Sequence, residues 1–227
     1  MTSPSLRFAV IFDMDGVIID SNPVIIKAWN TFFGRHDIIL TDDQLNRFVF
    51  GRTTKDTLRM VFERPLDESV ITEYGEEVST LVAELYEKES RLVPGITEFV
   101  TSLSEHKIPI AIATSAPRKN VDLVLRLAGL ADHFQIISDA AHVHLPKPDP
   151  EVYRMTAERL GISATRCLVF EDSFSGISAA KAAGMLVIGV STTHSVSELI
   201  SQTVEVIADF TSIDADYVTE LMRRSDR

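Results

Sequence analysis

The chain has 227 residues, of which 45% are hydrophobic, and its formal net charge is −11. It is long enough for one large domain, or for a core that carries a smaller insert. The acidic balance without a basic cluster argues against nucleic acid as a main partner, and no apolar run approaches the roughly 18 residues needed to span a bilayer. Residues 1–5 lack the basic and apolar blocks of a secretory signal. We therefore expect a cytoplasmic protein without a membrane partner.

The first predicted element is a strand over Phe8–Phe12, which ends in the sequence Asp13-Met14-Asp15-Gly16. An unbroken apolar run of this length is typical of a strand buried on both faces of a parallel sheet. The two carboxylates can converge where the strand ends and Gly16 lets the backbone turn. Paired carboxylates repel unless a cation or a shared proton intervenes. This pair therefore suggests a metal or acid–base site, although an ordinary surface turn fits equally well.

The chain between Asp20 and about Ser90 is helical in pattern. Asp20-Ser21-Asn22-Pro23 favours a helix start, and apolar residues then recur at three- and four-residue spacing without a convincing strand. We predict an all-helical insert.

After Val93-Pro94-Gly95 the pattern changes to alternating helices and strands. Helices are expected over 96–105, 121–128, 151–160, 175–183 and 216–224, and strands over 108–114, 134–138, 167–172 and 186–190, with a short apolar stretch at 204–207. Such alternation predicts an α/β fold with a parallel sheet and helices on both faces. Cys167 lies inside one of these apolar strands, which favours an inert core thiol over a nucleophile.

Polar residues follow several of the predicted strands. Thr114-Ser115 and Glu171-Asp172-Ser173 each close a strand, and a loop carries Lys147-Pro148-Asp149-Pro150. Binding crevices of such sheets lie at the carboxyl ends of the strands, so we expect these groups to gather near Asp13 and Asp15.

These four motifs, in this order, resemble those of the haloacid dehalogenase superfamily, and the helical insert resembles the cap of its β-phosphoglucomutase-like phosphatase branch. The resemblance covers nearly the whole chain. It implies a Rossmann-like core formed by residues 1–18 and 92–227, and a helical cap formed by residues 19–91.

The resemblance also implies roles for individual residues. Asp13 would be the nucleophile that forms an aspartyl-phosphate, and Asp15 would act as general acid and then as general base. Thr114 would bind the transferring phosphoryl group, and Lys147 would offset its charge. A Mg²⁺ ion is expected on Asp13, the backbone carbonyl of Asp15 and Asp172, with Glu171 bound directly or through water.

Substrate contacts are expected from Gly16, Ser115, Asn120 and Arg52. Arg52 belongs to Gly51-Arg52, which resembles an element of the branch that faces the active-site entrance, although a solvated arginine is the alternative. Asn22, Lys27 and Lys55 are weaker candidates.

The expected function is Mg²⁺-dependent hydrolysis of a small phosphorylated metabolite, such as a sugar phosphate, by a monomer. β-Phosphoglucomutases carry a histidine five residues after the aspartate that matches Asp20, whereas this chain has Ile25. That departure favours a phosphatase over a sugar-phosphate mutase, which is the nearest alternative. A catalytically inactive metabolite-binding protein is a further one, and the substrate itself is not identified by the sequence.

Overall fold

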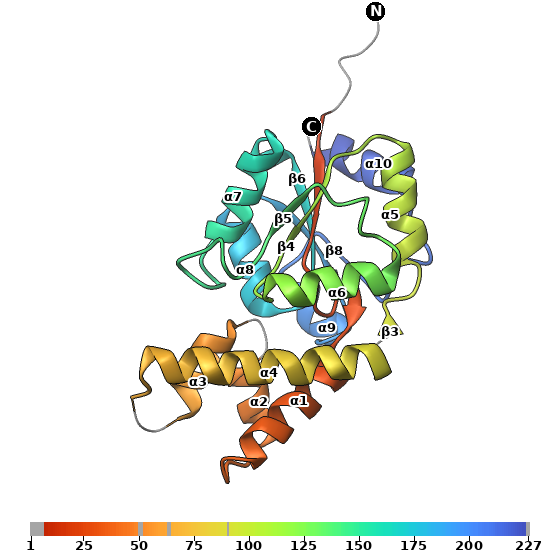
Figure 1. Cartoon of the computed structure of the whole chain (residues 1–227). Coiled ribbons are helices and arrows are strands. Elements are labelled where there is room, and N and C mark those ends of the chain that lie inside the picture. The colour runs from red at the N-terminus through yellow and green to blue at the C-terminus, as the bar shows by residue number, and fades with distance from the viewer. Residues whose placement is uncertain (1–6, 50–51, 63–64, 90, 226–227) are drawn as a thin grey trace, which may run out of the picture.

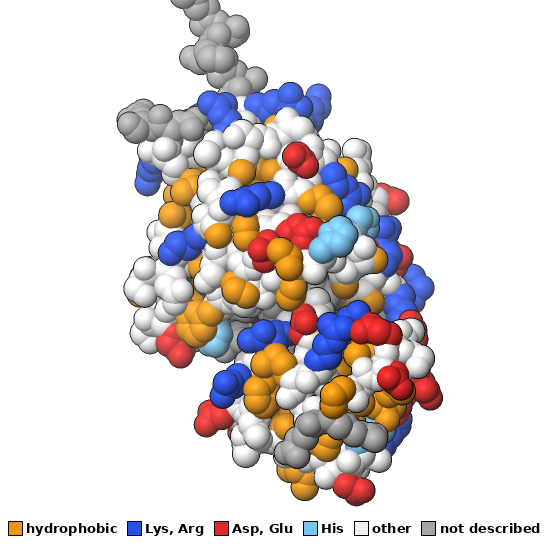
Figure 2. Space-filling view, turned by 90° about the vertical axis from the view of Figure 1, so that its left-hand side faces the viewer, with side chains coloured by type: hydrophobic (Ala, Val, Ile, Leu, Met, Phe, Trp, Pro, Cys, Tyr) orange, Lys and Arg blue, Asp and Glu red, His pale blue; other side chains and the backbone are white. Residues whose placement is uncertain are grey.

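The computed structural model describes residues 7–49, 52–62, 65–89 and 91–225 of the chain. It has two parts, an α/β core and a smaller helical cap, which lies below the core in Figure 1. The space-filling view shows the same division as two lobes that meet at a waist (Figure 2). None of the helices in the described ranges combines the length and the apolar character that a membrane crossing demands.

The core is built on a parallel sheet that has six strands within the described residues. Their order across the sheet is β5-β4-β1-β6-β7-β8, with every neighbouring pair parallel. The strands are β1 (Ala9–Phe12), β4 (Ile110–Ala113), β5 (Ile136–Ser138), β6 (Cys167–Glu171), β7 (Leu186–Val190) and β8 (Glu205–Ile207). β1 therefore lies in the middle of the sheet, although it opens the chain.

Helices cover both faces of this sheet, with α7 and α8 on the left in Figure 1 and α5 and α10 on the right. The core helices are α5 (Ile96–Glu105), α6 (Arg118–Ala128), α7 (Glu151–Leu160), α8 (Phe174–Ala182), the short α9 (Val196–Leu199) and α10 (Ala215–Ser225). Val10 and Phe12 pack into one hydrophobic cluster, and Ala9 and Ile11 into the other. Alternate residues of a strand point to opposite faces, which explains why the whole of β1 is apolar.

The cap consists, in its described part, of four helices inserted between β1 and α5. They are α1 (Asn22–Gly34), α2 (Asp42–Phe48), α3 (Thr54–Val61) and α4 (Glu68–Glu89). An aromatic cluster that includes Trp29, Phe32 and Phe33 holds α1 to its neighbours. α4 lies between α1 and the core, directly below α6 in Figure 1. The main contact between cap and core thus runs along α4.

A two-stranded antiparallel ribbon joins cap and core. It pairs β2 (Ile19–Asp20) with β3 (Arg91–Leu92) and contains both connections between the two parts. The sequence did not predict this ribbon, because a strand of two residues leaves no periodic pattern.

The predicted fold class is confirmed: the chain has a parallel α/β core with helices on both faces and a helical insertion that forms a cap. Helices 96–105 and 151–160 and strand 186–190 have the predicted bounds, whereas the strand expected over 108–114 is shorter, at Ile110–Ala113. Proline at 109 lacks the N–H that a central strand needs, which accounts for the later start. The domain boundaries at 18/19 and 91/92 stay a prediction.

Candidate active site

Two neighbouring strands bring the acidic residues together. Asp13 follows β1, and Asp172 follows β6. Every residue of β1 pairs with a residue of β6. The N–H of Asp13 donates to the carbonyl of Phe170 at 3.0 Å and extends this pairing by one residue. Since parallel strands end at the same edge, the two carboxylates lie side by side at the edge that faces the cap.

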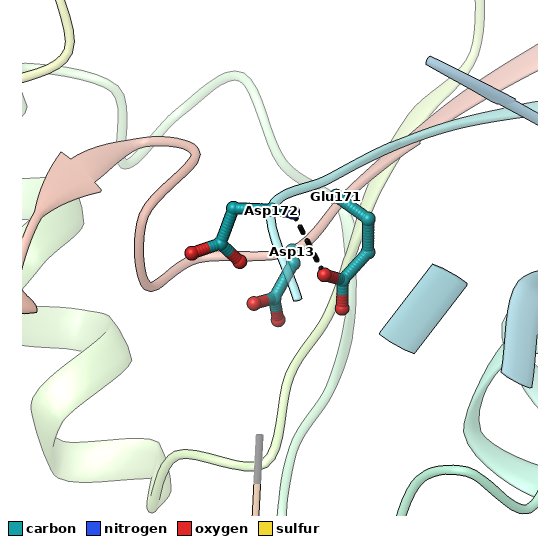
Figure 3. Close-up of side chains that lie close together, drawn as sticks. All are labelled: Asp13, Glu171 and Asp172. Carbon is teal, nitrogen blue, oxygen red and sulfur yellow. Dashed lines mark hydrogen bonds between the residues drawn. The ribbon is translucent and has the colours of Figure 1, made fainter. Parts of the chain in front are cut away.

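Asp13, Glu171 and Asp172 form a buried acidic group. One carboxylate oxygen from each lies within 4.8 Å of the others, and the three side chains converge in the close-up (Figure 3). Lys147 is the only buried cationic side chain in the described part of the chain. Its ammonium donates to Oδ1 of Asp13 at 3.1 Å and to Oε1 of Glu171 at 2.7 Å. Three carboxylates thus face one ammonium, which leaves negative charge in excess.

Glu171 is held rigidly by its hydrogen bonds. Its Oε1 accepts from Lys147 and from the hydroxyl of Tyr153, and its Oε2 accepts from the backbone N–H of Asp172 and from the N–H and hydroxyl of Ser173. A Cβ added at Gly176 would lie 1.5 Å from Oε1. The carboxylate therefore occupies the space above Gly176, where it anchors Lys147.

Asp172 is positioned by the turn after β1 and by the loop after β7. Gly16 has φ +74, and a Cβ there would come within 1.9 Å of Oδ2 of Asp172. The same oxygen accepts a hydrogen bond from the hydroxyl of Thr193, which in turn accepts from the side-chain amide of Asn22 at 2.7 Å. Because Asn22 belongs to α1, a cap residue is linked through Thr193 to this carboxylate.

Asp15 contacts the cap through Tyr86. The hydroxyl of Tyr86, near the end of α4, donates to Oδ1 of Asp15 at 2.6 Å. The Ser21 hydroxyl lies close to both groups and lowers the pKa of each, although it makes no hydrogen bond of normal geometry with the described residues. Burial and the neighbouring Asp15 raise the pKa of Tyr86 well above its usual value, so its hydroxyl stays a donor.

Burial dominates the charge states of the acidic groups. It raises the pKa of Asp13 to about 7, with Lys147 opposing the shift and Glu171 and Asp15 adding to it. Burial also raises the pKa of Asp15, and it raises that of Asp172 well above its usual value, helped there by Glu171 and Asp13. For Glu171, burial alone would raise the pKa, but the adjacent Lys147 lowers it overall.

Lys147 responds in the opposite sense to its neighbours. Burial alone would lower its pKa, but the carboxylates of Asp13 and Glu171 raise it well above the usual lysine value. The ammonium is therefore permanently charged. The acidic residues still crowd negative charge into a space from which water is largely excluded, and this arrangement favours a bound cation.

A cavity of about 100 Å³ lies between the acidic group and the cap. Of the predicted site residues, the following line it: Asp13, Asp15, Asn22, Arg52, Thr114, Ser115, Asn120, Lys147 and Asp172. Gly16 and Glu171 do not; they lie behind the carboxylate and ammonium groups that do. Lys27 and Lys55 point elsewhere and form exposed ion pairs with Glu89 and Glu68, whereas Gly51 lies outside the described residues.

Tyr86, Tyr153 and Thr193 are not among the site residues predicted from the sequence. The two tyrosines sit at apolar positions of amphipathic helices, and nothing in the spacing reveals that their hydroxyls reach Asp15 and Glu171. Thr193 follows β7 at the same edge as the acidic motifs. Because binding sites of parallel sheets lie at the carboxyl ends of the strands, Thr193 could have been predicted as a site residue, whereas the tyrosines could not.

Known proteins are similar to this chain in both sequence and fold. The pattern of the haloacid dehalogenase-like hydrolases matches residues 10–190. A phosphorylated carbohydrates phosphatase from Thermotoga maritima is 31% identical over 177 residues, covering 78% of this chain and 82% of that protein. A β-phosphoglucomutase from Bacillus subtilis is 29% identical over 191 residues, covering 80% and 82%.

Solved structures agree with the sequence comparison. A family IA hydrolase of the same superfamily from Entamoeba histolytica superposes with a TM-score of 0.85 at 27% identity, over 96% of this chain and all of that one. The matched region contains both the acidic edge of the sheet and the inserted cap. The chain therefore belongs to the haloacid dehalogenase-like hydrolases, in the β-phosphoglucomutase-like branch with a helical cap.

Proposed function

We propose that this hydrolase is a Mg²⁺-dependent phosphatase that cleaves a phosphorylated sugar through an aspartyl-phosphate on Asp13. The observation that carries the proposal is the buried group of Asp13, Glu171 and Asp172 with Lys147 as its cation. Carboxylates at the edge of a parallel sheet that line a cavity suit a reaction in which charge must be positioned and neutralised.

The donor set fits a magnesium ion. It offers only oxygen atoms, and the excess negative charge beside Lys147 matches a divalent cation. Asp13 and Asp172 have carboxylate oxygens that reach the cavity, whereas both oxygens of Glu171 already accept hydrogen bonds from the protein. Asp13, Asp172 and the carbonyl of Asp15 would hold the ion, and Glu171 would act through water. When bound, the ion neutralises charge on the phosphoryl group.

Other residues of the chain orient the nucleophile, bind the phosphoryl group and transfer the proton. Lys147 holds Oδ1 of Asp13, which restricts rotation of the attacking carboxylate. The oxygen of Thr114 accepts the N–H of Ala116 at 3.1 Å, so its own proton is directed away and can bind a phosphoryl oxygen. Asp15, whose pKa is raised by burial, gives a proton to the leaving oxygen and later takes one from the water that cleaves the aspartyl-phosphate.

Two observations bear on the substrate class. The Thermotoga relative is named for phosphorylated carbohydrates. Ile25 lines the cavity of this chain at the position where the mutase pattern has a proton-transferring histidine. An apolar side chain there cannot exchange a proton with a sugar hydroxyl, which favours transfer of the phosphoryl group to water. Arg52 also lines the cavity, which supports a contact with the leaving sugar.

The test is phosphate release from a panel of sugar phosphates with Mg²⁺, run with wild type and Asp13→Asn. We expect release that requires both the ion and Asp13. The panel includes β-glucose 1-phosphate, with glucose 6-phosphate measured separately. Faster formation of glucose 6-phosphate than of phosphate would replace the phosphatase by a mutase. Neither activity across the panel would favour a metabolite-binding protein.

A further inference from the structure

The hydroxyl of Tyr86 is a cap group that contacts a core carboxylate. Tyr86 is buried on α4, and its hydrogen bond to Oδ1 of Asp15 spans 71 positions of the sequence. Asp15 lines the cavity together with Tyr86. The contact therefore lies at the site itself.

We propose that Tyr86 is a positioning residue for Asp15: its hydroxyl binds Oδ1, so that the proton transferred to and from the reacting groups is carried by Oδ2. This inference rests on the proposed role of Asp15 as the acid and base of a phosphatase. It adds a residue of the cap to the residues that control the protonation of the leaving group.

The two oxygens of the Asp15 carboxyl group are not equivalent, because only Oδ1 accepts the hydrogen bond from Tyr86. An oxygen that accepts a short hydrogen bond from a tyrosine is a poor place for a proton, because the two hydrogens would face each other. The proton of the acid form therefore sits on Oδ2. In the first step Asp13 forms its bond to phosphorus, the P–O bond to the leaving group breaks with its electron pair on the leaving oxygen, and that oxygen takes the proton from Oδ2. In the second step water forms a bond to phosphorus and gives one proton to Oδ2, while the bond from Asp13 to phosphorus breaks and its electron pair returns to Asp13.

The same helix that carries Tyr86 also holds the cap against the core. Ser79 of α4 donates to the buried side chain of Asn120 in α6 at 3.0 Å. Glu76 of α4 pairs with Lys119 of α6, and Glu87 pairs with Arg126. In this structure Tyr86 therefore holds Asp15 while α4 rests against α6.

Tyr86→Phe removes the hydroxyl and keeps the ring that packs in the core. The matched control is Tyr74→Phe, which removes a hydroxyl from the same helix where the ring contacts Phe32, His36 and Phe62 in the cap. Each protein is followed through a single turnover with two substrates. One is the sugar phosphate that wild type cleaves best, whose alkoxide leaving group needs protonation. The other is p-nitrophenyl phosphate, whose weakly basic leaving group does not.

We expect Tyr86→Phe to slow the first turnover of the sugar phosphate by about 10- to 100-fold, the range for one hydrogen bond to a charged group. The rate of the nitrophenolate burst should change by less than about twofold, because the substitution leaves the attack of Asp13 on phosphorus unchanged. Dephosphorylation also uses Asp15, so aspartyl-phosphate should accumulate after the burst. Tyr74→Phe should match wild type with both substrates.

Equal slowing of both substrates would overturn the inference, because a general structural role would lower both rates by the same factor. An unchanged sugar-phosphate rate would overturn it as well. The ratio of the two rates within one protein is insensitive to partial unfolding. In the Asp15→Asn background, Tyr86→Phe should alter the residual rate by less than about twofold, since it acts through Asp15. Failure of wild type to release any phosphate would instead overturn the proposed function.

Discussion

The packing of Glu171 against α8 predicts opposite effects on stability for a glycine-to-alanine substitution at two positions, Gly176 and Gly75. Gly176 is the third residue of α8, and Gly75 lies within α4. Helix propensity alone favours alanine at either position by about 1 kcal/mol. At Gly75 a Cβ would meet only a methyl carbon of Thr54, at 3.8 Å, whereas at Gly176 it would lie 1.5 Å from Oε1 of Glu171.

Glu171 cannot move aside cheaply. Its two oxygens accept five hydrogen bonds from the protein, one of them from the buried ammonium of Lys147. Overpacking a core costs about 1–3 kcal/mol, and breaking a buried ion pair costs about 3–5 kcal/mol. After the gain in helix propensity, Gly176→Ala should lower the free energy of unfolding by about 3 kcal/mol or more.

Urea and thermal unfolding measure this difference. For a chain of this size, a loss of about 3 kcal/mol lowers Tm by about 6–12 °C, while Gly75→Ala should raise it by about 2–4 °C. Gly176→Ala should also reduce phosphatase activity, because Lys147 loses its anchor. If Gly176→Ala stabilised the protein as Gly75→Ala does, the assignment of a rigid, saturated Glu171 would be wrong.

Three further predictions concern the site and the core. Mg²⁺ at about 100 times its Kd should raise the free energy of unfolding by about 2.7 kcal/mol, which thermal unfolding would measure. Asp172→Asn should remove this stabilisation; if the stabilisation persisted, the ion would bind elsewhere. Burial raises the pKa of Asp13 from 3.8 to about 7, so in chelator Asp13→Asn should be more stable than wild type, by about 2–4 kcal/mol above pH 7. That gain should vanish as the pH falls toward 4, and a gain independent of pH would contradict the assignment. Burial raises the pKa of Cys167 to about 12, so iodoacetamide should modify it only after unfolding, as mass spectrometry would show.

The elements of the core could be predicted because their patterns are local. β1 and β4 are unbroken apolar runs, and β6 is apolar up to Glu171. The rule that sites follow parallel strands led from them to Asp13, Thr114 and Asp172. The helical character of the cap was equally visible in its spacing. These predictions needed no knowledge of which helix packs on which.

The contacts between cap and core could not be predicted in the same way. Tyr86 reaches Asp15, and Asn22 reaches Thr193, only because α4 and α1 pack against the core at one particular angle. The hydrogen-bond saturation of Glu171 depends likewise on Tyr153 of another helix. Such pairings are set by tertiary packing over long sequence separations, and a single sequence has no signal for them.

The ribbon of β2 and β3 has a consequence for how such a chain can vary. Because the two strands pair directly, the cap leaves and rejoins the core at a single place, where the chain ends of the insert lie next to each other. The entropy of closing a loop grows only with the logarithm of its length, by about 0.6 kcal/mol for each doubling. An insert of almost any size can therefore replace α1–α4 with little penalty to the sheet. A fold with this junction can therefore exchange its cap, and with it the substrates that reach the site, while the acidic edge of the sheet stays the same.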